Sequence, residues 1–486
     1  MNDFVNDSVN NSGRKPGGLA ELLIISMPLM LTMAAVTLNT FLDRVFLTWY
    51  SPSAGAAAMP GAMLCWTLVG VPMGIASYVN TFVAQYHGSG HPERIGPAIW
   101  QSVWFSLLVS PLLLLAIPMA GPLFRFFGHE ASMMEQEMLY FRIMIFGAGA
   151  NILSAALASF FTGRGQTQVV FVVDTVGVVL NCLLNFTLIF GTSGLAKLSQ
   201  EGSVMAPVFL RITKALHLTV PELGIRGAAL ATVAAMCCRC AIYFTLFLLP
   251  KARRVYATGR FRIDREIAWR LLRFGTPSGF MTVIDAGSFT IFLLLIGRLG
   301  EKTMLATNLA FSVNSIAFMP AVGLQIGVAA LVGRWIGQRN PDVAARVAWN
   351  GQLLSIGYMT LLAVGYVVAP QIFLWPFRQV MSAEDFAEIT SLTSLYMKFM
   401  AVYLIFDGVQ MVFSGTLRGA GDTRFLFIAV SGISCVSVAV CWIWVEMGGG
   451  SVGCWAILTA WVIALAVAMA ARFLGGRWKT MRVIEV

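Results

Sequence analysis

The chain has 486 residues, of which 58% are hydrophobic and only 12% are charged. Soluble domains carry about 25% charged residues, so the composition excludes an ordinary soluble protein. A bilayer-spanning helix takes about 20 residues, and the apolar content is enough for about twelve such helices. The formal charge of +10 is explained by basic loops on one side of a membrane and does not indicate nucleic-acid binding.

A polar tail opens the chain and twelve apolar segments follow it. The tail, residues 1–18, is rich in Asn and Ser, and we expect it to be disordered and cytoplasmic. The fold class that this pattern predicts is an all-α integral membrane protein with twelve transmembrane helices. The predicted spans lie near residues 20–49, 57–86, 96–122, 134–162, 169–191, 224–249, 270–299, 303–335, 344–370, 389–416, 425–446 and 451–475.

The second half of the chain repeats the first. The segment that ends at Pro28 matches the one that ends at Pro277, and the loop that begins at Gly88 matches the loop at Gly337, both 249 residues further on. A later pair of matches, 256 residues apart, places Asn151 opposite Asp407. An even number of spans per repeat leaves both repeats in the same orientation. The sequence therefore predicts two pseudo-symmetric bundles of six helices.

These repeats define the predicted domain organisation. We expect a first bundle over residues 19–249, a basic cytoplasmic linker over 250–269, a second bundle over 270–475 and a cytoplasmic tail over 476–486. The first repeat is longer by an insertion at 192–223, which we predict to be a loop on the outer side. Lys and Arg number 21 on the side that holds both termini and 8 on the other side. Because basic loops stay inside, both termini should be cytoplasmic, in the plasma (inner) membrane.

Asp43, Asp285 and Asp407 are the carboxylates that we expect well inside the spans. An ionisable group at that depth is costly, so it is a candidate for function. Burial disfavours a charged carboxylate and a bound cation favours it. Such a group can exchange a proton or a metal ion against a cationic substrate, as an antiporter requires.

Two further side chains share the helix face of Asp407. Tyr403 lies four residues before it and Gln410 three residues after it. A tyrosine ring beside a carboxylate can hold Na⁺ or an organic cation. Other interpretations stay open: Asp407 could accept a structural hydrogen bond, Tyr403 and Gln410 could be ordinary buried residues, and Asp43 could pair with a basic residue near the outer end of another span.

The order and duplication of these motifs resemble the multidrug and toxic compound extrusion family, MATE, over nearly all of residues 20–475. The motifs that carry the resemblance are Pro28 and Asp43, the loops at Gly88 and Gly337, Tyr140-Phe-Arg142, Gly165 to Gln168, and Leu417-Arg418-Gly-Ala-Gly-Asp422-Thr423. Tyr403 and Asp407 are similar to the NorM-type branch, whereas Asp285 stands where that branch usually has Glu. In the DinF-type branch an acid follows the span-five Asn by four residues, but here Asn181 is followed by Asn185.

This resemblance implies a multidrug efflux antiporter of the MATE/MOP type that works by alternating access. It implies cation coupling at Asp407, Asp285 and Tyr403, with Na⁺ held by the two acids. The residues implied for the substrate or a proton switch are Asp43, Gln410, Asn181, Asn185 and Asn308. The expected partners are organic cations and drugs, Na⁺ or H⁺ and the lipid bilayer, without other cofactors. We expect a monomer.

Other functions fit the sequence less well. None of the seven lysines follows a glycine, so a phosphate loop is absent and ATP does not drive transport directly. A lipid-linked oligosaccharide flippase of the same superfamily is the alternative function, but its cavity should be lined with intramembrane bases, and only Arg44, Arg142, Arg239 and Lys398 fall in spans. Catalytic His or Ser-His clusters are lacking, so the chain should not be an enzyme.

Overall fold

The computed structural model describes residues 15–126, 131–200, 207, 210–211, 220–375 and 383–485. Within these ranges twelve helical segments are long and apolar enough to cross a membrane, and no β-strand occurs. The spanning helices are α1 (Leu19–Tyr50), α2 (Pro52–Ser77) continued by α3 (Val79–Gly88), α4 (Ile95–Leu114), α6 (Ala131–Thr162), α7 (Thr167–Gln200), α9 (Ile225–Phe247), α11 (Arg265–Gly297), α12 (Glu301–Gly337), α13 (Pro341–Val368), α15 (Ala383–Ala420), α16 (Thr423–Glu446) and α17 (Ser451–Leu474).

Short elements and local signals connect these spans. Proline at the first helical position begins α2 and α13, where its missing N–H would be unpaired in any case. The carboxylate of Asp264 caps α11 and accepts the backbone N–H groups of Glu266 and Ile267 at 3.0 and 3.2 Å. The short elements are η2 (Pro92–Arg94), α5 (Ile117–Phe126), α10 (Pro250–Tyr256), α14 (Pro370–Leu374) and η4 (Arg477–Thr480).

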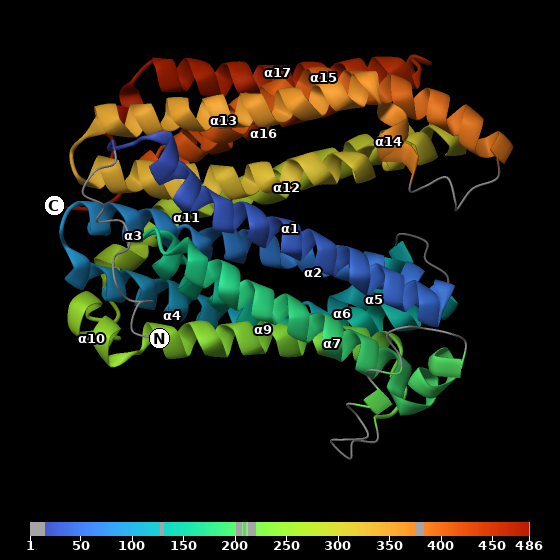
Figure 1. Ribbon diagram of the computed structural model, residues 1–486, viewed down its shortest axis with the longest axis horizontal. Coiled ribbons are helices and arrows are strands. Elements are labelled where there is room, and N and C mark those ends of the chain that lie inside the picture. The colour runs from blue at the N-terminus through green and yellow to red at the C-terminus, as the bar shows by residue number, and fades with distance from the viewer. Residues whose placement is uncertain are drawn as a thin grey trace.

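The helices pack as two bundles, one above the other in Figure 1. In the first bundle α6 packs against α2, α4 and α9, and α7 packs against α1 and α9. In the second bundle α15 packs against α12, α13 and α17, and α11 packs against α16. The predicted all-α fold of two six-helix bundles is confirmed.

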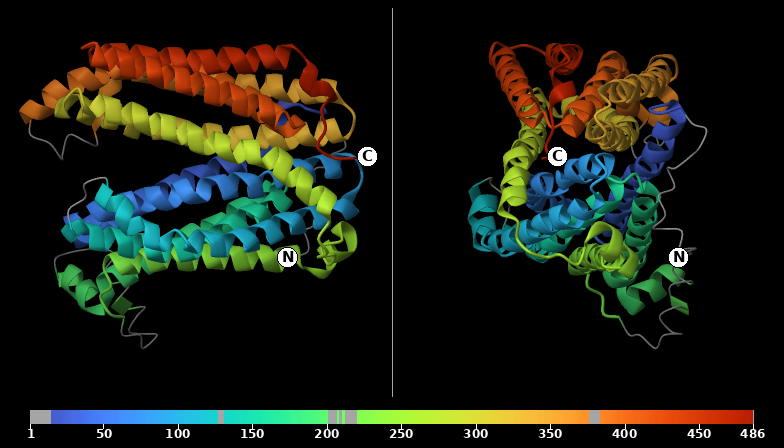
Figure 2. Two further views of the ribbon diagram at one scale, coloured as in Figure 1. Left: turned by 180° about the vertical axis from the view of Figure 1, so that it is seen from behind. Right: turned by 90° about the vertical axis from the view of Figure 1, so that its left-hand side faces the viewer.

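The bundles meet at the end of the molecule that holds both described chain ends, which we call the terminal face. The bundles converge there and lie apart toward the opposite end (Figures 1 and 2). The duplicated glycines allow the close approach: a Cβ at Gly88 would lie 1.9 Å from the carbonyl oxygen of Arg334, and one at Gly337 would lie 2.2 Å from that of Gln85. Gly74 and Gly279 bring α2 against α11 in the same way.

Replacing Gly88 by Ala should therefore weaken the joint between the bundles. The methyl group of the alanine would overlap the backbone carbonyl of Arg334, so α3 and α12 must move apart. Such overpacking lowers the free energy of unfolding by roughly 1–3 kcal/mol. The measurement is the thermal unfolding midpoint of the purified protein in detergent. Gly357→Ala on α13 is the matched control, because no heavy atom outside its own helix turn lies within 4 Å of the added carbon. Equal midpoints for the two variants would contradict this interpretation of the joint.

The C-terminal segment also belongs to the joint. Gln85 of α3 accepts the backbone N–H of Val483 at 2.9 Å and donates to the carbonyl of Gly419 at 3.0 Å. Val483 is 1% exposed, packed in an apolar core of the first bundle. Glu485 forms an ion pair with Arg270. The C-terminal segment thus binds to the first bundle through Val483.

In two polar segments the structure differs in detail from what the sequence predicted, where it describes them. The disordered tail was predicted to reach residue 18, but Arg346 and Asn350 donate to the carbonyls of Pro16 and Gly17 at 3.1 and 2.7 Å. The insertion is not a loop from its start, since α7 continues to Gln200 after a change of direction at Gly191, whose φ is 60°. Residues 1–14 and most of 201–219 lie outside the described residues.

Candidate functional site

In the first bundle Asp43 lies in a chain of amide side chains. Asn185 donates from Nδ2 to Asp43 Oδ1, and Asn39 donates to Asp43 Oδ2 at 3.4 Å. Asn185 also donates to Asn181 Oδ1 at 2.8 Å, and Asn181 donates to the Thr232 hydroxyl at 3.2 Å. Three predicted residues, Asp43, Asn181 and Asn185, are therefore brought together.

Helix geometry explains this cluster. Asn181 and Asn185 are four residues apart on α7, so they share one face, and both are buried. Asp43 lies near the end of α1, which packs along α7. The predicted alternative for Asp43, a salt bridge, does not occur among the described residues, because its partners there are two amides. Asn39 and Thr232 were missed by the sequence analysis; for Asn39 the signal was its position one turn before Asp43.

In the second bundle Asp407 lies on α15, in the middle of the span. Tyr403 is one helix turn earlier on the same face and is only 4% exposed. Asp285 lies on α11, another helix of the same bundle. The structure thus places Tyr403 and Asp407 on one face of α15 and Asp285 on α11, and their joint role stays a prediction.

Asp285 lies just beyond the joint between α2 and α11. A Cβ at Gly70 would lie 3.1 Å from Val283, two residues before Asp285, and residues 285–287 are exposed. Because residues two apart on a helix point in nearly opposite directions, Asp285 does not share the face by which Val283 contacts α2. Asp407 itself is half-buried.

The remaining two predicted residues are less closely tied to these acids. Gln410 is half-buried and lies on the same face of α15 as Tyr403 and Asp407. Asn308 is exposed on α12, and its backbone carbonyl accepts the hydroxyl of Ser312 at 2.8 Å. Among the described contacts no hydrogen bond joins the Asn308 side chain to the three acids.

A fourth acid, Asp174, lies near the start of its span and was not among the three predicted acids. Asp174 of α7 forms an ion pair with Arg239 of α9 at 3.5 Å and accepts the hydroxyl of Tyr243 at 3.0 Å. Arg239 also donates to Asn151 at 3.3 Å. Opposite charges in spans five and six were the available signal, since intramembrane charges tend to pair.

Breaking this pair from one side should destabilise the fold. Arg239→Met leaves a mostly buried carboxylate without its cation, and Asp174→Leu leaves the cation, each costing roughly 3 kcal/mol or more. The double variant Asp174→Leu/Arg239→Met removes both charges and should unfold at a higher temperature than either single variant. A thermal unfolding series of the four proteins in detergent tests this. Additive losses would show that the pair is not coupled.

The family model MatE matches two stretches of the chain, residues 28–187 and 277–443, which together make up more than half of it. The chain belongs to the MatE family. Two relatives, both described as "Probable multidrug resistance protein NorM", show how far the similarity extends. The protein from Xylella fastidiosa (strain Temecula1 / ATCC 700964) is 27% identical over 83% of this chain and 80% of its own length. The one from Brucella suis biovar 1 (strain 1330) is 24% identical over 97% and 96%.

Solved structures have the same fold as this MatE chain. A MOP superfamily transporter from Pyrococcus furiosus Vc1 (DSM3638) superposes with a TM-score of 0.79 at 19% identity, covering 96% of this chain and 98% of that one. A multidrug resistance MATE family transporter, described as outward-facing, gives a TM-score of 0.79 at 18% identity, with the same coverage. As a MatE family member, the chain is a multi-pass membrane transporter and not an enzyme.

Proposed function

We propose that this MatE protein exports organic cations and other amphipathic toxic compounds in exchange for Na⁺ or H⁺. The observation that carries the proposal is the contrast among the intramembrane acids. Asp174 is neutralised by Arg239, whereas Asp43 and Asp407 have no ion pair with a described basic residue. An acid without a built-in cation is available to a mobile one.

Asp407, Asp285 and Tyr403 are the proposed coupling site. Carboxylate and hydroxyl oxygens are hard ligands of the kind that bind alkali and alkaline-earth cations. A carboxylate inside a membrane protein also suits a proton, because a low-polarity environment favours its neutral form. The donor set thus fits either coupling ion. Asp43, with Asn181 and Asn185, is proposed to serve the substrate or the switch.

The arrangement of the bundles supports alternating access. They are joined at the terminal face and separate toward the opposite end, as one state of such a cycle requires. We propose that the terminal face is cytoplasmic, in the plasma (inner) membrane, because it carries most of the Lys and Arg. The multidrug specificity is proposed from the names of the NorM relatives. A monomer is proposed as the working unit.

Transport in inverted membrane vesicles tests the function. Under the proposal, a fluorescent organic cation accumulates inside when a Na⁺ gradient or a pH gradient is imposed, and the effective gradient identifies the coupling ion. Dissipating that gradient should release the cation. Vesicles that accumulate no cation under either gradient, although they contain folded protein, would contradict the proposal.

The flippase alternative is not favoured by the structure. A cavity for anionic headgroups needs intramembrane cations that are available to a ligand. Arg239, one of the few predicted in the spans, is already bound to Asp174 and Asn151.

A further inference from the structure

A surface that is both basic and apolar lies on the segment that connects the two bundles. This segment leaves α10, at the edge of the first bundle on the terminal face (Figure 1), and leads into α11. Its residues 260–263 read Arg-Phe-Arg-Ile, belong to no helix and are all exposed. With Arg265, Trp104 and Trp269 they form what we call the linker surface. Phe261, Ile263 and Trp269 are between 62% and 66% exposed, unusual for large apolar side chains beside three arginines.

The backbone of the linker surface is held against α4. Trp104 donates from Nε1 to the carbonyl of Phe261 at 2.9 Å, and Gln101 donates from Nε2 to the carbonyl of Arg262 at 3.1 Å. Gln101 Oε1 also accepts the backbone N–H of Asp264 at 3.1 Å. These bonds use only main-chain groups of the linker, so its arginine and apolar side chains stay available. A ligand would meet them on a backbone that is already ordered, which lowers the entropy cost of binding.

The linker surface carries a net positive charge. Among the described residues its three arginines make no side-chain ion pair or hydrogen bond. Two acids lie in the same stretch. Glu266 forms an ion pair with Arg270 at 3.2 Å, so these two charges cancel. Asp264 caps α11 and keeps its negative charge. Three arginines against this one acid leave a net charge of +2.

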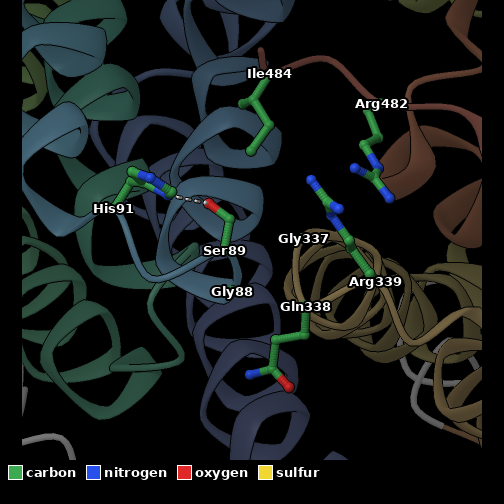
Figure 3. Close-up of a pocket in the computed structure, with 8 residues that line it drawn as sticks. All are labelled: Gly88, Ser89, His91, Gly337, Gln338, Arg339, Arg482 and Ile484. Carbon is green, nitrogen blue, oxygen red and sulfur yellow. Dashed lines mark hydrogen bonds between the residues drawn. The ribbon is translucent and has the colours of Figure 1, made fainter. Parts of the chain in front are cut away.

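Other charges of the terminal face lie away from the linker surface. Glu93 is an exposed acid in η2, before the start of α4 at Ile95. Trp104 lies nine residues beyond Ile95, about 14 Å along the helix axis, and exposed charges are largely screened beyond roughly 10 Å. The bases of α10 are left out of the surface because α10 packs against η2. Arg339 and Arg482 line a separate pocket between the duplicated loops and the C-terminal segment (Figure 3).

The start of α11 lies at the level of the lipid headgroups. The helix has 33 residues and is therefore about 50 Å long, whereas the hydrocarbon core of a bilayer is about 30 Å thick. Its first nine residues include four charged side chains, and the next charge is Asp285. The charged start thus lies outside the hydrocarbon core. Trp269 lies within it, and tryptophan is enriched at membrane–water interfaces.

We propose that the linker surface binds an anionic phospholipid of the adjacent leaflet. Arginine forks match the geometry of phosphate oxygens and bind them in pairs of hydrogen bonds. Basic residues beside a membrane attract anionic lipids, and exposed aromatic and aliphatic side chains enter the boundary between headgroups and acyl chains. The bound lipid ties the connection between the bundles to the membrane. This binding does not depend on the proposed transport function.

The experiment uses the purified full-length protein and three variants. Arg262→Gln removes one charge of the linker surface, and Phe261→Ser removes one apolar side chain. Both side chains are exposed and only their carbonyls bond to α4, so both variants should unfold at the midpoint of the parent. Arg94→Gln is the matched control, because Arg94 is an exposed base on the same end of the same bundle, in η2 and outside the linker surface.

Native mass spectrometry with phosphatidylglycerol and with phosphatidylcholine of the same acyl chains measures the binding. We expect the parent to prefer phosphatidylglycerol and Arg262→Gln to weaken its binding roughly fivefold, the contribution of one base near a membrane surface. Binding of phosphatidylcholine by that variant should not change. Phe261→Ser should weaken both lipids, because its contact is with the apolar part, and Arg94→Gln should weaken neither. Equal affinity of the parent for the two lipids, or an equal loss in Arg94→Gln and Arg262→Gln, would overturn the proposal.

Discussion

Replacing Asp407 by Asn is expected to abolish export against a gradient while the protein stays folded. The change keeps the volume of the side chain and removes its charge. On α15, Asp407 lies one helix turn from buried Tyr403, and no described base would be left unpaired by its loss. Losing one charged ligand should weaken binding of the coupling ion by roughly 10- to 100-fold.

Vesicle uptake of a fluorescent cation, with and without the coupling gradient, measures this effect. Asp342→Asn is the matched control, because that acid lies on the terminal face with Lys479 and outside the proposed ion site, so its uptake should be unchanged. Asp285→Asn should lower uptake less than Asp407→Asn does, since Asp285 is exposed. If Asp407→Asn transported at the rate of the parent, Asp407 would be a structural hydrogen-bonding residue and the proposed coupling site would be wrong.

The span count and the two bundles could be predicted because they depend on local properties of the chain. Hydrophobic length defines each helix, and the repeated motifs at Pro28 and Pro277 show the duplication directly. The position of Tyr403 and Asp407 on one helix face likewise follows from helical periodicity. These features need no knowledge of which helices touch.

Contacts between distant helices could not be predicted in this way. Asn181 and Asn185 were candidates because of the family resemblance, but the hydrogen bond from Asn185 to Asp43 depends on how α1 packs against α7. The contact of Val483 with Gln85 joins residues 398 positions apart. No periodicity within a helix carries that information.

The missed acid shows a different limit. Asp174 stands among valines near the start of its span, and Arg239 lies in the next span, so each looked isolated in the sequence. Their attraction becomes visible only when α7 and α9 are adjacent. Two intramembrane charges of opposite sign in consecutive spans should have been treated as a pair, because each alone would be costly in a bilayer.

The Asp43 cluster allows an equally strong test in the first bundle. Asp43→Asn should abolish cation export and leave the protein folded, because the cluster can accept an amide at this position. The carbonyl oxygen of the introduced amide can take the place of Asp43 Oδ1 and accept the hydrogen bond from Asn185 Nδ2, so Asn185 keeps its orientation and its hydrogen bond to Asn181. The hydrogen bond to Asn185 is then kept, and the substitution removes the negative charge and the long 3.4 Å contact with Asn39.

The matched comparison is Asp174→Asn in the same bundle. That substitution leaves Arg239 without its charged partner, so it should lower the thermal unfolding midpoint, whereas Asp43→Asn should not. The two variants together separate loss of stability from loss of transport: Asp43→Asn reduces vesicle uptake to background at a normal midpoint. A large fall in the midpoint of Asp43→Asn would show that its carboxylate is needed for folding. Normal uptake by that variant would exclude Asp43 from substrate binding and from the switch, since the amide keeps the shape of the site and differs from the native side chain chiefly in charge.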